Sequence, residues 1–227
     1  MTGSWLSQRK IIAFDMDGTL IADRLIFRLA DRFGFKGKLE DIMAMGVPEY
    51  EKTRRIARLL KGITASELLY TLEQIPLSMG AEFVTQQLKE RGHFLVIISD
   101  SYTLATEHLK AKLGFDRTVA NRLVVIDGKI TGEVEMPLNW SDKDSDCLKY
   151  KYSVCKLTSL IEISEEMNIP LKSCVAIGDS MADIGMLRGA GIGVAFNPKS
   201  RLVEKSADVV LHNDLGELLG IIDVLRR

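Results

Sequence analysis

Four aspartates in two short stretches are the residues of this chain best suited to chemistry. They are Asp15, Asp17, Asp179 and Asp183, and each pair follows a short apolar run. Carboxylates gathered in one place repel one another unless a cation sits among them or some are protonated, and carboxylate oxygens are ligands that Mg²⁺ accepts. A single aspartate after a strand is usually a turn or helix-cap residue. Four in two motifs instead favour a site for a hard divalent cation.

Ser99 and Lys156 would supply the donors and positive charge of an anion site. Ser99 ends another apolar run and begins a turn whose backbone N–H groups would face an incoming anion, although a helix cap is the simple alternative. Lys156 begins a predicted helix, where a cation is unfavourable with respect to the helix dipole; this invites a functional explanation, with an ordinary helix residue as the equal alternative.

The elements that must position these residues alternate along the chain. Continuous apolar runs, typical of strands buried on both faces, occupy residues 10–14, 94–98, 174–177, 192–196 and 208–211. Helical patterns lie at residues 81–91, 104–113 and 156–167. This alternation predicts an α/β fold with a doubly wound, parallel, Rossmann-like sheet, whose ligands bind at the carboxyl ends of the strands.

Residues 21–80 show a different pattern, because amphipathic helical segments follow one another there without a strand. Thr64 to Glu67 form a capping box at the start of one of these helices. We therefore predict a small helical cap at residues 21–80, inserted into an α/β core made of residues 1–20 and 81–227. An Asp127-Gly128 turn between two apolar runs predicts a hairpin within the core.

Composition excludes some classes of partner and site. The 227 residues include 30 basic and 31 acidic side chains, so the net charge of -1 gives no general attraction to nucleic acid or to an anionic membrane. Three cysteines without metal-binding spacing argue against a disulfide framework or a zinc site, and favour reduced thiols. No stretch is typical of a signal sequence or membrane span, so we expect a cytoplasmic protein.

Four motifs carry a resemblance to a known superfamily. Residues 14–20, Ser99, Lys156 and residues 178–183 resemble, in this order, the four motifs of the haloacid dehalogenase-like superfamily. Residues 120–132, the helical insert and residues 194–210 are together similar to phosphoserine phosphatases and their close relatives. The resemblance covers nearly the whole chain, and the first and fourth motifs together are highly specific.

The resemblance implies a phosphoric monoester hydrolase that works through an aspartyl-phosphate. Asp15 would be the nucleophile, and Asp17 the general acid and base. Mg²⁺ would be held by the side chains of Asp15 and Asp179 and by the backbone carbonyl of Asp17. Residues Ser99 and Lys156, with the backbone amides after Asp15 and Ser99, would hold the phosphoryl oxygens.

Two more acids would support this site. The resemblance places Asp100 beside Ser99 at the phosphate-binding turn, where it replaces a glycine and is similar to relatives that transfer phosphate from phosphoserine to homoserine. We favour a helix cap for Asp100 over a role in acceptor choice. Asp183 would orient a metal-bound water or Lys156.

The helical insert matches the family least. Phosphoserine phosphatases usually carry a glutamate on the cap that meets the amino group of serine, and Arg24 stands at that position here. Arg54 or Arg55 would correspond to the arginine that meets the serine carboxylate, although each also suits an ordinary solvated helix surface. Residues 137–154 are longer than the family's connection, and we expect a solvated loop rather than a dimer contact or substrate lid.

The most specific expectation is hydrolysis of phosphoserine to serine, with Mg²⁺ as cofactor. The alternatives are a phosphotransferase that uses an alcohol such as homoserine, and a phosphatase of another small phosphorylated metabolite; a non-catalytic sensor of phosphorylated ligands is disfavoured by the intact acid beside the nucleophile. The expected partner is a small phosphorylated metabolite, without nucleic acid or membrane, for a monomer or homodimer.

Overall fold

The computed structural model describes residues 9–224. Their strands form one seven-stranded sheet. The strands follow the order β4-β3-β2-β1-β5-β6-β7, and neighbours are parallel except for the antiparallel pair of β3 and β4. Their bounds are β1 Ile11–Phe14, β2 Phe94–Tyr102, β3 Arg117–Ile126, β4 Lys129–Glu135, β5 Cys174–Gly178, β6 Ile192–Phe196 and β7 Val209–Leu211. The predicted α/β fold, its five strands and the hairpin at Asp127-Gly128 are confirmed.

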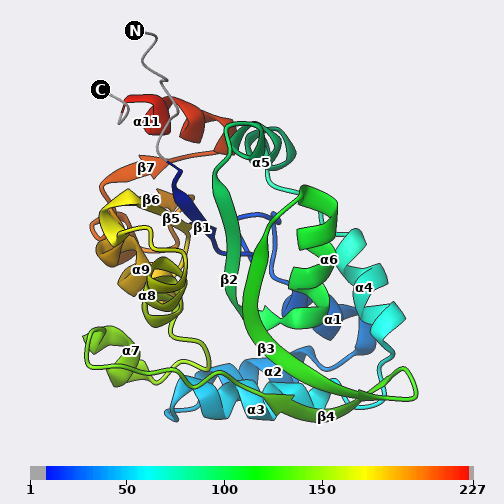
Figure 1. Ribbon diagram of the computed structural model, residues 1–227. Coiled ribbons are helices and arrows are strands. Elements are labelled where there is room, and N and C mark those ends of the chain that lie inside the picture. The colour runs from blue at the N-terminus through cyan, green and yellow to red at the C-terminus, as the bar shows by residue number, and fades with distance from the viewer. Residues whose placement is uncertain (1–8, 225–227) are drawn as a thin grey trace, which may run out of the picture.

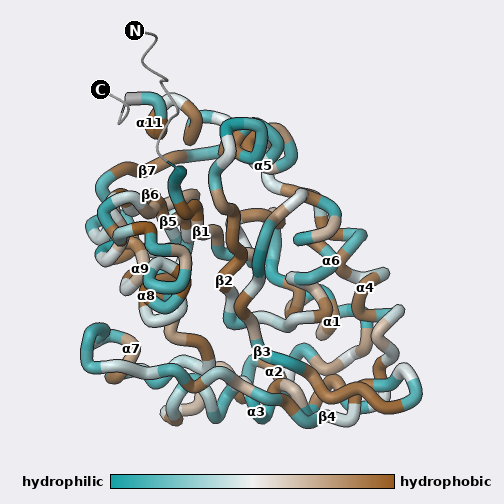
Figure 2. The backbone as a smooth tube through the Cα atoms, in the orientation of Figure 1, coloured by the Kyte–Doolittle hydropathy of each residue, from teal (hydrophilic) through white to brown (hydrophobic). Residues whose placement is uncertain are grey.

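Helices cover both faces of the sheet (Figure 1). Ile12 and Phe14 of β1 share a buried cluster with α5 and α6, whereas Ile11 and Ala13 share another with α8 and α9. Because side chains alternate along a strand, β1 contributes to both clusters, and Figure 2 shows hydrophobic residues along β1 and β2 between the two helical layers. The bounds of these helices are α5 Ala81–Glu90, α6 Thr103–Leu113, α7 Ser145–Tyr150, α8 Lys156–Glu166, α9 Ile184–Gly189, α10 Arg201–Glu204 and α11 Leu218–Val224.

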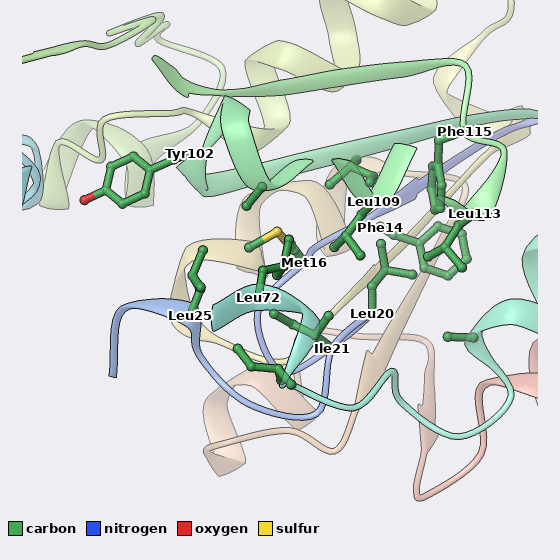
Figure 3. Close-up of a cluster of buried hydrophobic side chains, with 14 of the residues drawn as sticks. Phe14, Met16, Leu20, Ile21, Leu25, Leu72, Tyr102, Leu109, Leu113 and Phe115 are labelled. Carbon is green, nitrogen blue, oxygen red and sulfur yellow. The ribbon is translucent and has the colours of Figure 1, made fainter. Parts of the chain in front are cut away.

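The chain between β1 and α5 contains the predicted helical insert. Its helices are α1 Leu25–Phe33, α2 Lys36–Ala44, α3 Glu49–Leu59 and α4 Ala65–Glu73. The capping box of Thr64 and Glu67 at the start of α4 is confirmed. Leu25 and Leu72 of the insert lie in one buried cluster with Phe14 of the sheet (Figure 3). The insert is therefore packed on the core through a shared hydrophobic cluster, and its bounds at residues 21 and 80 stay a prediction.

The register of the three central strands aligns their carboxyl ends. Phe14 of β1 lies beside Ile97 of β2 and Ile177 of β5. The polar residues that follow these positions therefore meet at one edge of the sheet, where ligands of open α/β sheets bind.

Two segments differ from their expected structure. β3 begins at Arg117, and its first residues pair in parallel with β2, so the predicted hairpin extends the main sheet. The expected loop at residues 137–154 contains the helix α7, and Trp140 Nε1 donates a hydrogen bond of 2.6 Å to the backbone oxygen of Tyr152. Within residues 9–224, we find no helix with the length and apolar character needed to cross a membrane.

Candidate active site

Asp15 lies at the tip of β1, where the chain turns sharply. Its backbone N–H donates to the Ile177 oxygen at 2.9 Å, which continues the pairing of β1 with β5. The turn requires glycine at position 18, because φ is 82° there and a Cβ atom would lie 2.1 Å from Asp179 Oδ2. This close approach brings the first and fourth motifs together.

Lys156 joins two of the buried acids. Its Nζ atom donates to Asp15 Oδ1 and to Asp183 Oδ1, each at 2.6 Å, and its side chain is only 1% exposed. Burial alone would lower the pKa of Lys156, but the two carboxylates raise it above its ordinary value, so the side chain stays charged. The predicted convergence of Lys156 with Asp15 and the orienting contact of Asp183 on Lys156 are present in the structure.

Asp15, Asp179 and Asp183 form a buried acid cluster that fits a hard cation. One carboxylate oxygen from each lies within 4.8 Å of the others. Asp179 Oδ1 is buried and accepts no hydrogen bond from the described residues, whereas Oδ2 is paired with Lys199 Nζ at 2.5 Å. A buried carboxylate oxygen without a donor is suited to Mg²⁺.

The raised pKa values of Asp15 and Asp179 also favour a cation site. Burial, followed by the charge of Asp183, raises the pKa of Asp15 well above its ordinary value, although Lys156 acts in the opposite direction. Burial and Asp183 also raise the pKa of Asp179. A cation among these groups would favour their ionised forms.

Asp183 is better suited to orienting its neighbours than to binding a metal. Its Oδ2 accepts hydrogen bonds from the backbone N–H of Ser180 at 2.8 Å, from the Ser180 hydroxyl at 2.7 Å and from the Asp179 N–H at 3.2 Å. With Oδ1 held by Lys156, both oxygens are occupied. Asp183 therefore holds the loop that presents Asp179.

The Asp17 carboxyl contacts the start of the helical insert. Its Oδ1 accepts a 2.7 Å hydrogen bond from the backbone N–H of Leu25, at the start of α1. Burial raises the pKa of Asp17 to about 6, with the Leu25 bond acting in the opposite direction. A carboxyl group with this pKa can both donate and accept a proton near neutral pH.

Ser99 and Asp100 lie within β2, which continues to Tyr102. The helix cap that we favoured for Asp100 is wrong, because α6 begins only at Thr103 and Tyr102 is its N-cap residue. Ser99 is fully buried, and its Oγ accepts from the Ser101 N–H at 3.2 Å. The buried Asn121, to which the sequence assigned no role, donates to the backbone oxygen of Asp100 at 2.6 Å.

A cavity of about 300 Å³ opens beside Asp17, between the insert and the core. The insert contributes Arg24 and Lys52, β2 contributes Asp100, and residues 137–154 contribute Tyr152. The cavity adjoins Asp17, two residues after Asp15, and its volume suits a small organic group.

Arg54 and Arg55 do not line this cavity. Both are exposed, and Arg54 pairs with Glu51 at 3.0 Å. Lys52 faces the cavity instead, together with Glu49 one turn before it, to which it is paired at 2.8 Å. Helical periodicity with Ile56, which also lines the cavity, could have identified this face of α3 from the sequence.

The described cysteines form no disulfide. Cys147, Cys155 and Asp144 nevertheless lie together, with one donor atom from each within 4.8 Å, a grouping that their spacing did not predict. Asp144 accepts from the Cys147 N–H at 2.9 Å, and the Thr158 hydroxyl donates to Cys155 Sγ at 3.1 Å. These contacts satisfy the group within the protein.

Comparison with known proteins agrees with this geometry. The model of the haloacid dehalogenase-like hydrolase family matches residues 12–188. A phosphoserine phosphatase of Methanocaldococcus jannaschii is 32% identical over 219 residues, which cover 95% of this chain and 98% of that protein. A phosphoserine phosphatase of Polaromonas sp. is 30% identical over 229 residues, with coverage of 96% and 91%.

A solved structure shows the same arrangement of the chain. It is described as a phospho-aspartyl intermediate analogue of phosphoserine phosphatase, and it is 30% identical, with a TM-score of 0.78 over 95% of this chain and 99% of the other. The region matched by the family model contains the whole acid cluster and Lys156.

Proposed function

The chain belongs to the haloacid dehalogenase-like hydrolases, within the phosphoserine phosphatase-like group, and it is a phosphoric monoester hydrolase. We propose that it hydrolyses phosphoserine with Mg²⁺ through an aspartyl-phosphate. The observation that carries the proposal is the contact of Lys156 with both Asp15 and Asp183, in one buried cluster with Asp179. Simple binding of a phosphate would not need an acid of raised pKa beside a buried carboxylate.

The first half of the reaction forms the covalent intermediate. A carboxylate oxygen of Asp15 attacks phosphorus, the bond from phosphorus to the serine oxygen breaks, and Asp17 gives its proton to that oxygen. Lys156 and Ser99 would hold the phosphoryl oxygens as negative charge spreads over them. Mg²⁺ bound by Asp15, Asp179 and the Asp17 carbonyl would reduce the repulsion between the carboxylate and the phosphate.

The second half releases inorganic phosphate. Asp17, now ionised, takes a proton from a water molecule as that water attacks phosphorus. The bond from phosphorus to the Asp15 oxygen breaks, and the Asp15 carboxylate is restored. Asp17 is protonated again and is ready for the next substrate molecule.

Phosphate release from phosphoserine, with and without Mg²⁺, tests the proposal. We expect Mg²⁺-dependent release, and we expect Asp17→Asn to lose turnover while it accumulates a phosphoryl adduct that intact-protein mass spectrometry detects when the leaving group is p-nitrophenolate. This leaving group needs little protonation, so the first half proceeds and the second does not. Adding homoserine should not divert phosphate from water.

A phosphoserine-inert protein that hydrolyses another phosphomonoester would contradict the substrate and leave the mechanism intact. Phosphohomoserine as the main product would show a phosphotransferase. Unchanged turnover by Asp17→Asn would contradict the assigned acid and base.

A further inference from the structure

Two opposite charges in the cavity beside Asp17 have no ion-pair partner among residues 9–224. Arg24 precedes α1 and is half-buried, and its guanidinium lies 5.5 Å from the centre of the Phe27 ring. Asp100 of β2 is also half-buried, and its backbone oxygen accepts a hydrogen bond from Asn121. Among the described residues, neither the Arg24 guanidinium nor the Asp100 carboxylate forms an ion pair or a side-chain hydrogen bond.

The other charges that line the cavity are already engaged. Lys52 and Glu49 pair with each other at 2.8 Å, and Asp17 is held by the Leu25 N–H. The protein therefore satisfies these groups itself. Arg24 and Asp100 differ from these groups, although they line the same cavity, and each would be stabilised by a ligand group of opposite charge.

Arg24 and Asp100 face the same space without touching. Burial would lower the pKa of Arg24, but the charge of Asp100, ahead of those of Asp17 and Asp15, raises it overall. The two groups thus influence each other across the cavity while no direct pair closes it. A ligand that places an anion beside one and a cation beside the other would complete both contacts.

We propose that Arg24 binds the carboxylate and Asp100 binds the ammonium group of a phosphorylated α-amino acid. This rests on the proposed function, since the phosphoryl group must occupy the site at Asp15. A guanidinium suits a carboxylate because two of its N–H groups can donate in parallel. Asp100 directly follows Ser99, so the ammonium lies near the phosphoryl end, and the cavity of about 300 Å³ has room for a small amino acid.

The arrangement explains how this chain accommodates arginine at position 24. In the family that it resembles, a glutamate on the cap meets the ammonium group. Here the acidic side chain, Asp100, comes from β2 of the core, and the cap contributes the basic side chain of Arg24. The two charges needed for a zwitterion are kept, but the acid is moved from the cap to the core.

Four substrates separate the two contacts. Phosphoserine carries both charged groups, 3-phosphoglycerate lacks the ammonium, phosphoethanolamine lacks the carboxylate, and p-nitrophenyl phosphate lacks both. We expect kcat/KM of the unchanged protein to be highest for phosphoserine, because an analogue that lacks one group leaves a charge of the site unpaired.

Two single variants then assign each contact. Asp100→Asn should lower kcat/KM for phosphoserine and phosphoethanolamine about tenfold to a hundredfold, mainly through KM, and should leave 3-phosphoglycerate unchanged or improved. Arg24→Gln should lower kcat/KM for phosphoserine and 3-phosphoglycerate by a similar factor and spare phosphoethanolamine. Turnover of p-nitrophenyl phosphate by both variants shows that they are folded.

Arg28→Gln is the matched control, because Arg28 lies one turn further along α1, is exposed and pairs with Asp23 at 2.7 Å, outside the cavity. It should leave all four substrates unchanged. The inference is overturned if Asp100→Asn affects phosphoserine and 3-phosphoglycerate equally, or if the unchanged protein hydrolyses p-nitrophenyl phosphate but does not prefer phosphoserine to its two analogues. Absence of Mg²⁺-dependent hydrolysis of every substrate, p-nitrophenyl phosphate included, would instead overturn the proposed function, and this inference with it.

Discussion

The acid cluster at the strand ends differs from the cavity wall, which is formed by the residues around the cavity beside Asp17, in how its charged side chains are paired. In the cluster, Lys156 is almost completely buried and contacts Asp15 and Asp183 at 2.6 Å each. In the cavity wall, Arg24 and Asp100 are half-buried and form no direct pair. On the proposed function, the groups for bond breaking would be held by the protein itself, whereas the groups for recognition would be completed by the ligand.

The largest effect is expected when Asp15 of the acid cluster is replaced, if this cluster is the reactive region. Asp15→Asn should lower kcat for phosphomonoesters by a factor on the order of 10⁴ or more, because no covalent intermediate can form. Phosphate release measures this loss, and circular dichroism checks the fold. Asp41→Asn, on an exposed position of α2, is the control and should keep full activity. Retention of even a tenth of the activity by Asp15→Asn would place the nucleophile elsewhere.

Lys156 tests whether the cluster depends on its internal counter-ion. Lys156→Met should lower the free energy of unfolding by about 3–5 kcal/mol at neutral pH, because two buried carboxylates lose their partner. Lys199→Met, which removes the ion pair with Asp179 from a side chain that is 48% exposed, should cost at most about 1 kcal/mol. Urea denaturation measures both, and equal losses would contradict the contrast between buried and exposed charge.

Mg²⁺ should stabilise the cluster and have no such effect through the cavity wall. At a concentration one hundred times Kd, a ligand that binds only the folded state adds about 2.7 kcal/mol, which a thermal unfolding scan detects as a rise in Tm. Asp179→Asn should abolish this rise, and Asp100→Asn should keep it. A full Mg²⁺ response in Asp179→Asn would move the metal away from Asp179.

The smallest effect is expected in the cavity wall. Lys52→Met removes a pair with Glu49 in which the side chains are 16% and 36% exposed, so the free energy of unfolding should fall by less than about 1 kcal/mol. Chemical denaturation measures this change beside that of Lys156→Met. A loss as large as that of Lys156→Met would mean that the wall holds the insert in place.

The sequence predicted the shared edge of the strand ends because its signals are local. Continuous apolar runs identify buried parallel strands, and parallel strands in register must bring their following residues to one edge. Asp15, Ser99 and Asp179 could thus be placed together without any knowledge of side-chain directions. The position of Lys156 at a helix start left its role open, and the resemblance of its motif assigned it to the site.

The cavity wall could be predicted only in part. Each residue along a helix turns by about 100°, so a small error in alignment exchanges the cavity face for the solvent face. This is why Arg54 and Arg55 were chosen and Lys52 was missed. Asp100 was assigned to a helix cap because nothing local showed that β2 continues to Tyr102, and the Lys199 contact depends on a loop far along the chain.

The hydrogen bond from the Leu25 amide to Asp17 ties the direction of this carboxyl group to the start of α1. A displacement of α1 would remove this donor and, with it, the fixed direction of the Asp17 carboxyl. On the proposed function, proton transfer by Asp17 would therefore depend on the position of the helical insert.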